Sequence, residues 1–377
     1  MKPAPGSGRE VLGVFLRLGV TAFGGPAAHT AMMRDEMVRR RGWVDDQRFL
    51  DLMAGTNLIP GPNSTELALH LGHDRARWRG FFAAGFAFIV PAAVITACFG
   101  WLYVEYGSTP VAEGLLRGVQ PVVLAVIAHA VVGLGRVAVK GWQTAGLGLA
   151  AFAAAMAGVP ELGVLAAAVV VALAAGVAPS ARAGLRSWAL LPVLVMAGGG
   201  YGDRGDLATL FWTMLRIGAV LYGSGYVLVA FFEGAFVQDL GWLSPQELLD
   251  AVAVGQVTPG PVFSTATFVG YLIAGPAGAA VATIAIFLPA FAFVALLTRV
   301  GDDARSRPWV RRALDGAAVA SLALMAAVCV QLGVDVLADP LAWALALAAL
   351  ALLLRTSISS VWLVAAGGAI GVAAHLL

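Results

Sequence analysis

The sequence has little charge. Of its 377 residues, only 12% are charged and 60% are hydrophobic, and the mean hydropathy is +0.85. A soluble domain carries about a quarter charged residues. The chain therefore has too few polar groups to cover a water-facing surface, which excludes a soluble enzyme and a disordered protein. The composition indicates a polytopic membrane protein.

Cysteine and lysine are also scarce. Cys98 and Cys329 are too few for a disulfide framework or a zinc cluster. Only Lys2 and Lys140 among the 24 basic residues are lysine. No Walker loop, dinucleotide fingerprint or HExxH motif is present, so we expect no ATP-driven pump, no enzyme, no metal or organic cofactor and no nucleic-acid partner. Residues 1–10 lack an apolar core, and we expect no cleavable signal peptide.

Long apolar runs dominate the rest of the chain. They fall in two sets, at roughly 11–32, 80–104, 111–135, 141–158 and 160–178, then 207–232, 276–298, 313–333, 338–354 and 357–377. Within each set, a mixed segment broken by Pro-Gly-Pro separates the first two runs, at 49–72 and 248–275. We expect two membrane halves, 11–178 and 207–377, joined by a linker at 179–206.

The two halves are related by an internal duplication. When the chain is shifted by 199 residues, 16–62 aligns with 215–261 without a gap. The matching residues include Arg17 with Arg216, Gly24 with Gly223, Gly42-Trp43 with Gly241-Trp242, Asp51 with Asp250, and Pro60-Gly61-Pro62 with Pro259-Gly260-Pro261. Duplicated membrane halves are typical of secondary transporters and some channels. The fold prediction is an all-α polytopic membrane protein with two halves of about five spans each plus a re-entrant hairpin.

Charge predicts that the halves are inverted. Half one carries a run of basic residues after its first span, at Arg34, Arg39, Arg40, Arg41, Arg48, Arg75, Arg77 and Arg79. The matching segments 233–247 and 272–278 hold no Lys or Arg, whereas 299–312 is basic. Because cytoplasmic loops are enriched in Lys and Arg, the cytoplasmic side switches between the halves. Lys2 and Arg9 conflict with this topology unless the run 11–32 is itself a hairpin bent at its glycines.

Each Pro-Gly-Pro is predicted to be the tip of a re-entrant hairpin. Arg48 and Arg75 require the same side of the membrane although 49–72 lies between them. Proline ends one helix and suits the first turn of the next, so the following N–H groups would face into the membrane as an anion site. The candidate anion-binding residues are Gly61, Asn63, Ser64, Thr65, Gly260, Ser264 and Thr265. The alternative is that Pro-Gly-Pro only kinks a helix that the hydroxyls cap.

Two arginines lie inside apolar runs at equivalent positions. A charge there is costly unless it meets water or a partner. Arg17 and Arg216 are therefore candidates to bind one anion from both halves. The alternatives are that each side chain reaches the membrane interface or pairs with a carboxylate.

Three kinds of residue are candidates for proton coupling or capping. His29 and Glu66 lie in apolar surroundings and are candidates to carry protons. The alternative for His29 is a structural hydrogen bond, and the alternative for Glu66 is an interhelical contact or an ion pair. Neither residue has a counterpart in half two. Asp51 and Asp250 match each other, and we expect them to cap the beginnings of the hairpins.

Together these motifs resemble the chromate ion transporter family. The residues that carry the resemblance are Phe23-Gly24-Gly25-Pro26, His29, Gly42-Trp43, Asn57 with Pro60-Gly61-Pro62-Asn63, and Gln256 before the second Pro-Gly-Pro. Both halves are covered, so the chain is similar to a long, two-repeat member. The resemblance adds Gly24, Gly25, Asn57 and Gln256 to the candidate substrate-binding residues.

The resemblance implies a proton-coupled antiporter that exports chromate from the cytoplasm and confers chromate resistance. We expect it to span the inner (plasma) membrane many times, with chromate, protons and the lipid bilayer as partners and a homodimer as its assembly. The residues alone indicate only an anion. The alternatives are therefore a carrier for sulfate or oxyanions in general and a passive anion channel. A membrane chromate reductase would need a flavin, a haem or a thiol pair.

Overall fold

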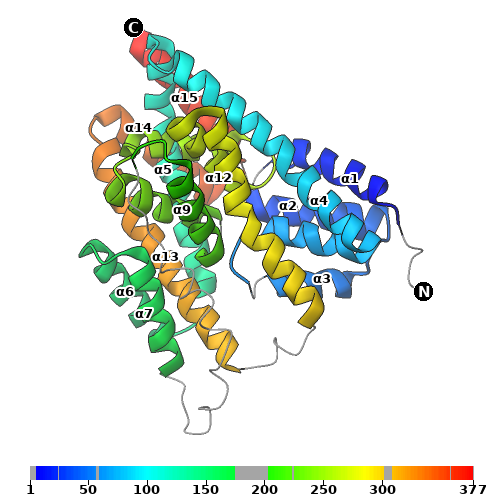
Figure 1. Ribbon diagram of the computed structural model, residues 1–377. Helices are drawn as coiled ribbons and strands as arrows, with labels where there is room; N and C mark the ends of the chain where they lie inside the picture. The colour runs from blue at the N-terminus through cyan, green and yellow to red at the C-terminus, as the bar shows by residue number, and fades with distance from the viewer. Residues whose placement is uncertain are drawn as a thin grey trace.

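The computed structural model describes residues 6–23, 25–56, 59–174, 203–222, 225–300, 308–356 and 358–376. All regular elements within these ranges are helical, and Figure 1 shows them as one bundle of long and short helices. Most of the predicted linker, 179–206, lies outside the described residues.

The helices fall into two series. The first consists of α1 (Gly8–Thr21), α2 (Gly25–Arg34), η1 (Asp35–Arg40), α3 (Asp46–Thr56), α4 (Asn63–Tyr106), α5 (Pro110–Ala138), α6 (Trp142–Met156) and α7 (Glu161–Ala174). The second consists of α9 (Leu207–Val220), η3 (Gly225–Val227), α10 (Leu228–Phe232), η4 (Glu233–Asp239), α11 (Pro245–Val257), η5 (Val262–Ser264), α12 (Thr265–Val300), α13 (Pro308–Val336), α14 (Pro340–Arg355) and α15 (Ser360–Leu376). The two series have the same order, which confirms the duplication.

An unusual backbone kink occurs at the same place in both series. Ala76 and Arg77 in α4 have φ/ψ values of −140°/27° and 53°/−142°. Ala274 and Gly275 in α12 have −144°/31° and 58°/−149°. Each kink separates a short arm from a long helix. The backbone itself is therefore duplicated, including a conformation that non-glycine residues rarely adopt.

The short arms complete two helical hairpins. α3 ends at Thr56, the chain turns through Pro60-Gly61-Pro62, and the first part of α4 returns toward the kink. α11 and the beginning of α12 repeat this path around Pro259-Gly260-Pro261. The predicted hairpins with Pro-Gly-Pro at their tips are thus present in both halves.

The first apolar run forms two helices instead of one span. α1 ends at Thr21 and α2 begins at Gly25, because glycine and proline in this segment interrupt the helix. Trp43, beyond the far end of η1, donates from Nε1 to Glu10 Oε1 at 3.1 Å, so the chain returns to the side on which α1 begins. The expected single span over 11–32 is therefore replaced by a hairpin, and the charge conflict of Lys2 and Arg9 disappears.

The two long helices run antiparallel. Arg299 near the end of α12 lies 5.7 Å from the ring centroid of Trp78 at the beginning of the long part of α4. Near the other end of α4, Tyr103 meets Phe268 on the short arm of α12, which leads through the kink into the long helix, with ring centroids 5.4 Å apart. Equivalent helices that contact each other in opposite directions are what inverted repeats produce.

The last helices of each half pack on the other half. α15 lies against α5, and α7 lies against α13. Gly118 of α5 is in backbone contact with Gly367 and Gly371 of α15, and Gly316 of α13 contacts α7 at Ala168. Small residues permit this close approach, which is the main source of helix association in a bilayer.

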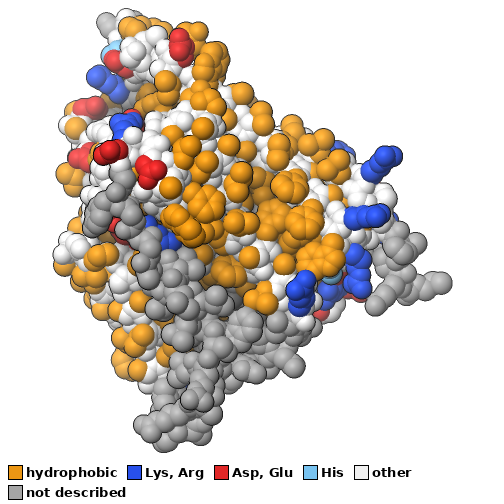
Figure 2. All heavy atoms as spheres, in the orientation of Figure 1, with side chains coloured by type: hydrophobic (Ala, Val, Ile, Leu, Met, Phe, Trp, Pro, Cys, Tyr) orange, Lys and Arg blue, Asp and Glu red, His pale blue; other side chains and the backbone are white. Residues whose placement is uncertain are grey.

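The surface matches a membrane setting. Four described helices are long and apolar enough to cross a bilayer, namely Asn63–Tyr106, Pro110–Ala138, Val262–Arg299 and Arg312–Val336. Figure 2 shows hydrophobic side chains across the middle of the visible face. Lys and Arg gather at the end where α1 and α3 lie, whereas most of the visible Asp and Glu lie at the opposite end, together with a few Lys and Arg.

The α5–α15 contact generates the first prediction. Gly118→Ala should destabilise the protein by about 1–3 kcal/mol because its Cβ would overlap backbone atoms of Gly367 and Gly371. Gly133→Ala in the same helix is the control, since nothing lies within 4 Å of its Cβ and alanine favours the helix by up to about 1 kcal/mol. Thermal unfolding in detergent should show a lower midpoint for Gly118→Ala alone. Equal midpoints would contradict the described packing of α15.

Candidate functional site

The two hairpin tips are held by a reciprocal pair of backbone hydrogen bonds. Gly61 N–H donates to Leu221 O at 2.8 Å, and Gly260 N–H donates to Ala22 O at 2.9 Å. Each acceptor lies at the end of α1 or α9 in the other half. Because both flanking prolines lack an N–H, glycine is the only residue in each Pro-Gly-Pro that can donate. Each tip is thus fixed by the other half of the molecule.

The surroundings of the tips are tightly packed. Gly260 has φ +88°, and a Cβ there would lie 2.8 Å from Ala92 Cβ and 3.2 Å from Gly19 O. Gly61 has φ +133°, and a Cβ there would overlap the carboxylate of Glu66. Both positions need glycine for its conformational freedom and for space. The N–H groups of these two predicted binding glycines are already used, so they hold the tips in place.

Buried hydroxyl groups follow each tip. Pro62 and Pro261 are the N-caps of the half-helices, and Ser64, Thr65 and Ser264 are all buried. The first N–H groups of a helix have no acceptor within it. The Thr65 N–H nevertheless donates to Pro62 O at 2.8 Å, so Ser64 and Thr65 offer an anion mainly their buried hydroxyls at the positive end of a helix.

The hydroxyls differ in how well they are paired. Thr65 Oγ1 is buried without a hydrogen-bond partner in the described part of the chain. Thr265 at the matching position donates from Oγ1 to Val262 O at 2.8 Å. Thr96 Oγ1 donates to Ser264 Oγ at 3.4 Å. Half one consequently has the more available hydroxyl donor.

Glu66 and His29 lie at different tips. Glu66 is fully buried beside Gly61, and neither carboxylate oxygen has a hydrogen-bond partner among the described residues. His29 Nε2 donates to Ala22 O at 3.1 Å, the same carbonyl that accepts from Gly260. His29 therefore contacts the support of the second tip, although it belongs to the first half.

Gln256, Gly25 and Tyr226 form a further polar group near the second hairpin. Gln256 is buried, and its side chain interacts with the Tyr226 hydroxyl. Gln256 and Tyr226 both line a small pocket beneath η3, and a Cβ on Gly25 would lie 3.5 Å from Tyr226 Oη. The candidate residues Gly24 and Asn57 lie outside the described residues.

The described contacts do not bring Arg17 and Arg216 to the tips. Arg17 is exposed on α1, on the same surface as Leu16 and Val20. The Arg216 guanidinium is half-buried and lies against its own helix, with Nη2 3.5 Å from Thr213 Oγ1 and Nε 3.4 Å from the Trp212 carbonyl oxygen. Their part in anion binding stays a prediction.

The expected capping role of Asp51 and Asp250 is wrong. Asp45 Oδ1 accepts from Arg48 N–H at the beginning of α3, and Ser244 caps α11 in a capping box with Glu247. Asp250 is instead buried and accepts hydrogen bonds from the side chains of two other helices. Sequence matching identified Asp250, but only the tertiary structure shows its partners.

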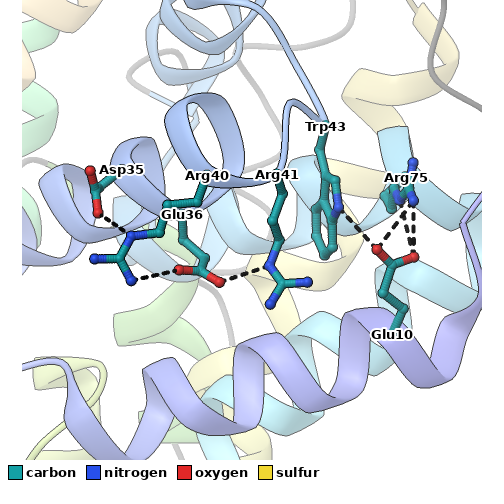
Figure 3. Close-up of polar contacts among 7 residues, drawn as sticks. All are labelled: Glu10, Asp35, Glu36, Arg40, Arg41, Trp43 and Arg75. Atoms are coloured by element: carbon teal, nitrogen blue, oxygen red, sulfur yellow. Dashed lines mark hydrogen bonds and ion pairs between the residues drawn. The ribbon is translucent and has the colours of Figure 1, made fainter.

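A cluster of charged residues joins the N-terminal end of α1 to the first hairpin (Figure 3). Arg75 Nη2 lies 3.0 Å from Glu10 Oε2, and the Arg75 guanidinium stacks 5.3 Å from the Trp43 ring centroid. Neighbouring ion pairs join Asp35 with Arg40 and Glu36 with Arg40 and Arg41. Half two has Thr209 and Ile273 in place of Glu10 and Arg75. Half two therefore lacks this particular ion pair, although Arg204 Nη2 lies 3.8 Å from Glu247 Oε1 at the beginning of α11.

The fold and tips define a duplicated, multi-pass membrane protein with two hairpin tips that meet the opposite repeats. The family model described as "Chromate transporter" matches residues 9–179 and 208–372. The chain belongs to the chromate transporter family.

Relatives match along most of the chain. A chromate transport protein of Cupriavidus metallidurans is 31% identical over 98% of this chain and 94% of its own length. A probable chromate transport protein of Synechococcus elongatus is 30% identical over 88% and 86%. One from Pseudomonas aeruginosa, named a chromate transport protein, is 31% identical over 88% and 82%. No solved structure matches the chain.

The packing of the second tip generates a prediction. Gly260→Ala should lower the thermal midpoint and reduce the rate of chromate transport at least several-fold. Its Cβ would overlap Ala92 and Gly19 and weaken the hydrogen bond to Ala22. Gly241→Ala is the control, since Gly241 also has positive φ, +61°, but has nothing within 4 Å. It should cost only the backbone strain of about 1–2 kcal/mol. Similar losses in both variants would show that strain, not tip contact, is responsible.

Proposed function

We propose that this protein exports chromate from the cytoplasm across the inner membrane in exchange for protons. The observation that carries the proposal is the pair of hairpin tips, each fixed by the opposite repeat and followed by buried hydroxyls. Membership of the chromate transporter family supports chromate as the cargo.

The anion site in this proposal is formed by the beginnings of the two half-helices. Chromate is a tetrahedral dianion, so it needs several donors from different directions. Thr65 Oγ1 is a buried donor without a partner among the described residues, and the buried Gln256 amide beside Tyr226 adds a donor from the other half. The helix ends after Pro62 and Pro261 add N–H groups and the positive ends of their dipoles. Asn63, Ser64, Ser264 and Thr265 complete the proposed set.

The proton sites in this proposal are Glu66 and His29. A carboxylate that is fully buried without hydrogen bonds is costly when charged, so Glu66 should carry a proton in the described state. If Glu66 releases this proton when the anion binds next to Gly61, or when the anion leaves, proton movement and chromate movement are linked. His29 shares the carbonyl of Ala22 with the second tip and would sense movement of that tip.

The orientation of the protein in this proposal is inferred from charge. The basic end, which holds Arg75 and the Arg39-Arg40-Arg41 run, is placed in the cytoplasm by the positive-inside rule. In alternating access, inverted repeats rock about a fixed central site. The tips would then open in turn toward the basic end and toward the acidic end.

Labelled chromate uptake into inverted vesicles with an imposed pH gradient tests the site. Thr65→Val should raise the KM for chromate at least about tenfold, because the anion loses one charge-assisted hydrogen bond of about 1.5–3 kcal/mol. Its thermal midpoint should be unchanged or higher, since the hydroxyl is unpaired in the described state. Thr265→Val is the control, with a smaller change in KM, because that hydroxyl already donates to Val262.

The same assay separates the alternatives. Equal KM values for the two threonine variants would move the anion site away from the first tip. A fall in accumulation for the double variant Arg17→Ala and Arg216→Ala would indicate that these arginines bind the anion. Uptake by the double variant at the level of the native protein would exclude them. Uptake of sulfate without chromate would change the cargo. Flux that ignores the gradient would indicate a channel.

A second experiment tests proton coupling. Glu66→Gln keeps the shape of the side chain but cannot ionise, so accumulation driven by the pH gradient should fall at least tenfold. Exchange of labelled for unlabelled chromate at equal pH should persist, because it needs no net proton movement. Leu67→Met, at a neighbouring buried position, is the control for packing and should keep both activities. Gradient-driven accumulation in Glu66→Gln would rule out Glu66 as the coupling residue.

A further inference from the structure

A second buried carboxylate lies at the contact between the two repeats. Asp250 of α11 is 2% exposed. Its Oδ2 accepts from Tyr103 Oη at 2.9 Å, and its Oδ1 accepts from Gln120 Nε2 at 2.9 Å. Tyr103 belongs to α4 and Gln120 to α5, so both donors come from half one while the acceptor belongs to half two. The two bonds therefore join the second hairpin to the opposite repeat.

The charge of Asp250 has no ionic partner in the part of the chain that the structure describes. The titratable groups that face it are the Tyr103 phenol and the Glu247 carboxylate one turn earlier on α11. Neither is cationic. Arg117 lies one turn before Gln120 on α5, but its side chain is exposed. An ionised carboxylate in this place is held only by two neutral donors, which makes loss or gain of a proton accessible.

This arrangement is absent from the other half. Asp51 occupies the matching position of α3, but it is half-buried and accepts from Gln47 on the same helix at 3.0 Å. Ala318 of α13 stands where α5 has Gln120. The backbone is duplicated, but the cluster of Asp250, Tyr103 and Gln120 occurs once, just as Glu66 occurs at one of the two tips.

The chemistry of the cluster allows two protonation states. An ionised Asp250 accepts both hydrogen bonds. A protonated Asp250 donates one and accepts one, because the Gln120 amide can present its oxygen and the Tyr103 hydroxyl can donate or accept. Both states are satisfied only while α4, α5 and α11 stay together. Separation of the repeats would remove the donors and make the charged form more costly, so proton binding and repeat movement are linked.

We propose that Asp250 is a second proton-carrying residue of the transporter, with Tyr103 and Gln120 as positioning residues that tie its protonation to the contact between the repeats. The proposal rests on the proposed proton-coupled function. It differs from the Glu66 site in its place: Asp250 lies on α11, the first arm of the second hairpin, whereas Glu66 follows the first tip, and the proposed role of Asp250 needs no contact with the anion.

Vesicle transport tests the proposal through two activities of each variant. Asp250→Asn mimics the protonated state and keeps hydrogen-bonding capacity, so exchange of labelled for unlabelled chromate at equal pH should remain within about twofold of native. Accumulation driven by the pH gradient should fall at least tenfold. Asp51→Asn is the matched control and should leave both activities unchanged. Gradient-driven accumulation by Asp250→Asn at the native level would overturn the proposal.

A second variant tests the proposal if Asp250→Asn does not fold. Tyr103→Phe keeps the ring against Phe268 but removes one donor to the charged carboxylate. The pH at which gradient-driven transport is half-maximal should therefore move to higher values, and Gln120→Leu should move it in the same direction. An unshifted profile in both would show a structural role and overturn the proposal. If the native protein shows no gradient-driven accumulation, the proposed proton coupling fails instead, and with it both carboxylate roles.

Discussion

The fold depends on two backbone hydrogen bonds that cross between the repeats. Gly61 donates to Leu221 and Gly260 donates to Ala22, and each glycine is the only donor in its Pro-Gly-Pro. An unpaired N–H in an apolar interior costs a few kcal/mol, so a tip that reaches into the membrane must find an acceptor. In both cases the acceptor is a backbone carbonyl of the opposite repeat. Together with the exchanged packing of α7 on α13 and α15 on α5, this makes the two repeats one folding unit.

A symmetric backbone carries an asymmetric set of chemical groups. The kinks, the tips and the helix bounds are similar in the two repeats, but the ionisable residues are not. Glu66 is equivalent in position to Thr265, His29 to Leu228, and the buried Asp250 to the half-buried Asp51. Symmetry of the frame permits two related conformations of similar energy. Asymmetry of the ionisable groups gives those conformations different affinities for protons, and a coupled transporter needs that difference.

The sequence predicted much of the candidate site but not how its groups are used. Two copies of Pro-Gly-Pro in register predicted both tips, and the structure has them where expected. The tip glycines were expected to bind an anion, but their N–H groups are bonded to the opposite repeat. Arg17 was expected beside the anion; its side chain is exposed on α1, and its part in anion binding stays a prediction.

Local pattern by itself determined the class of this protein. Low charge, runs of apolar residues, the repeat and the alternation of basic loops follow from the cost of charge and unpaired backbone in a bilayer, so they can be read residue by residue. The tertiary structure alone decided which groups meet. Asp250 contacts residues more than 100 positions away, and a carboxylate that could cap α11 is buried because α4 and α5 of the other repeat supply its donors. Such contacts depend on how the inverted repeats interlock, which no local pattern encodes.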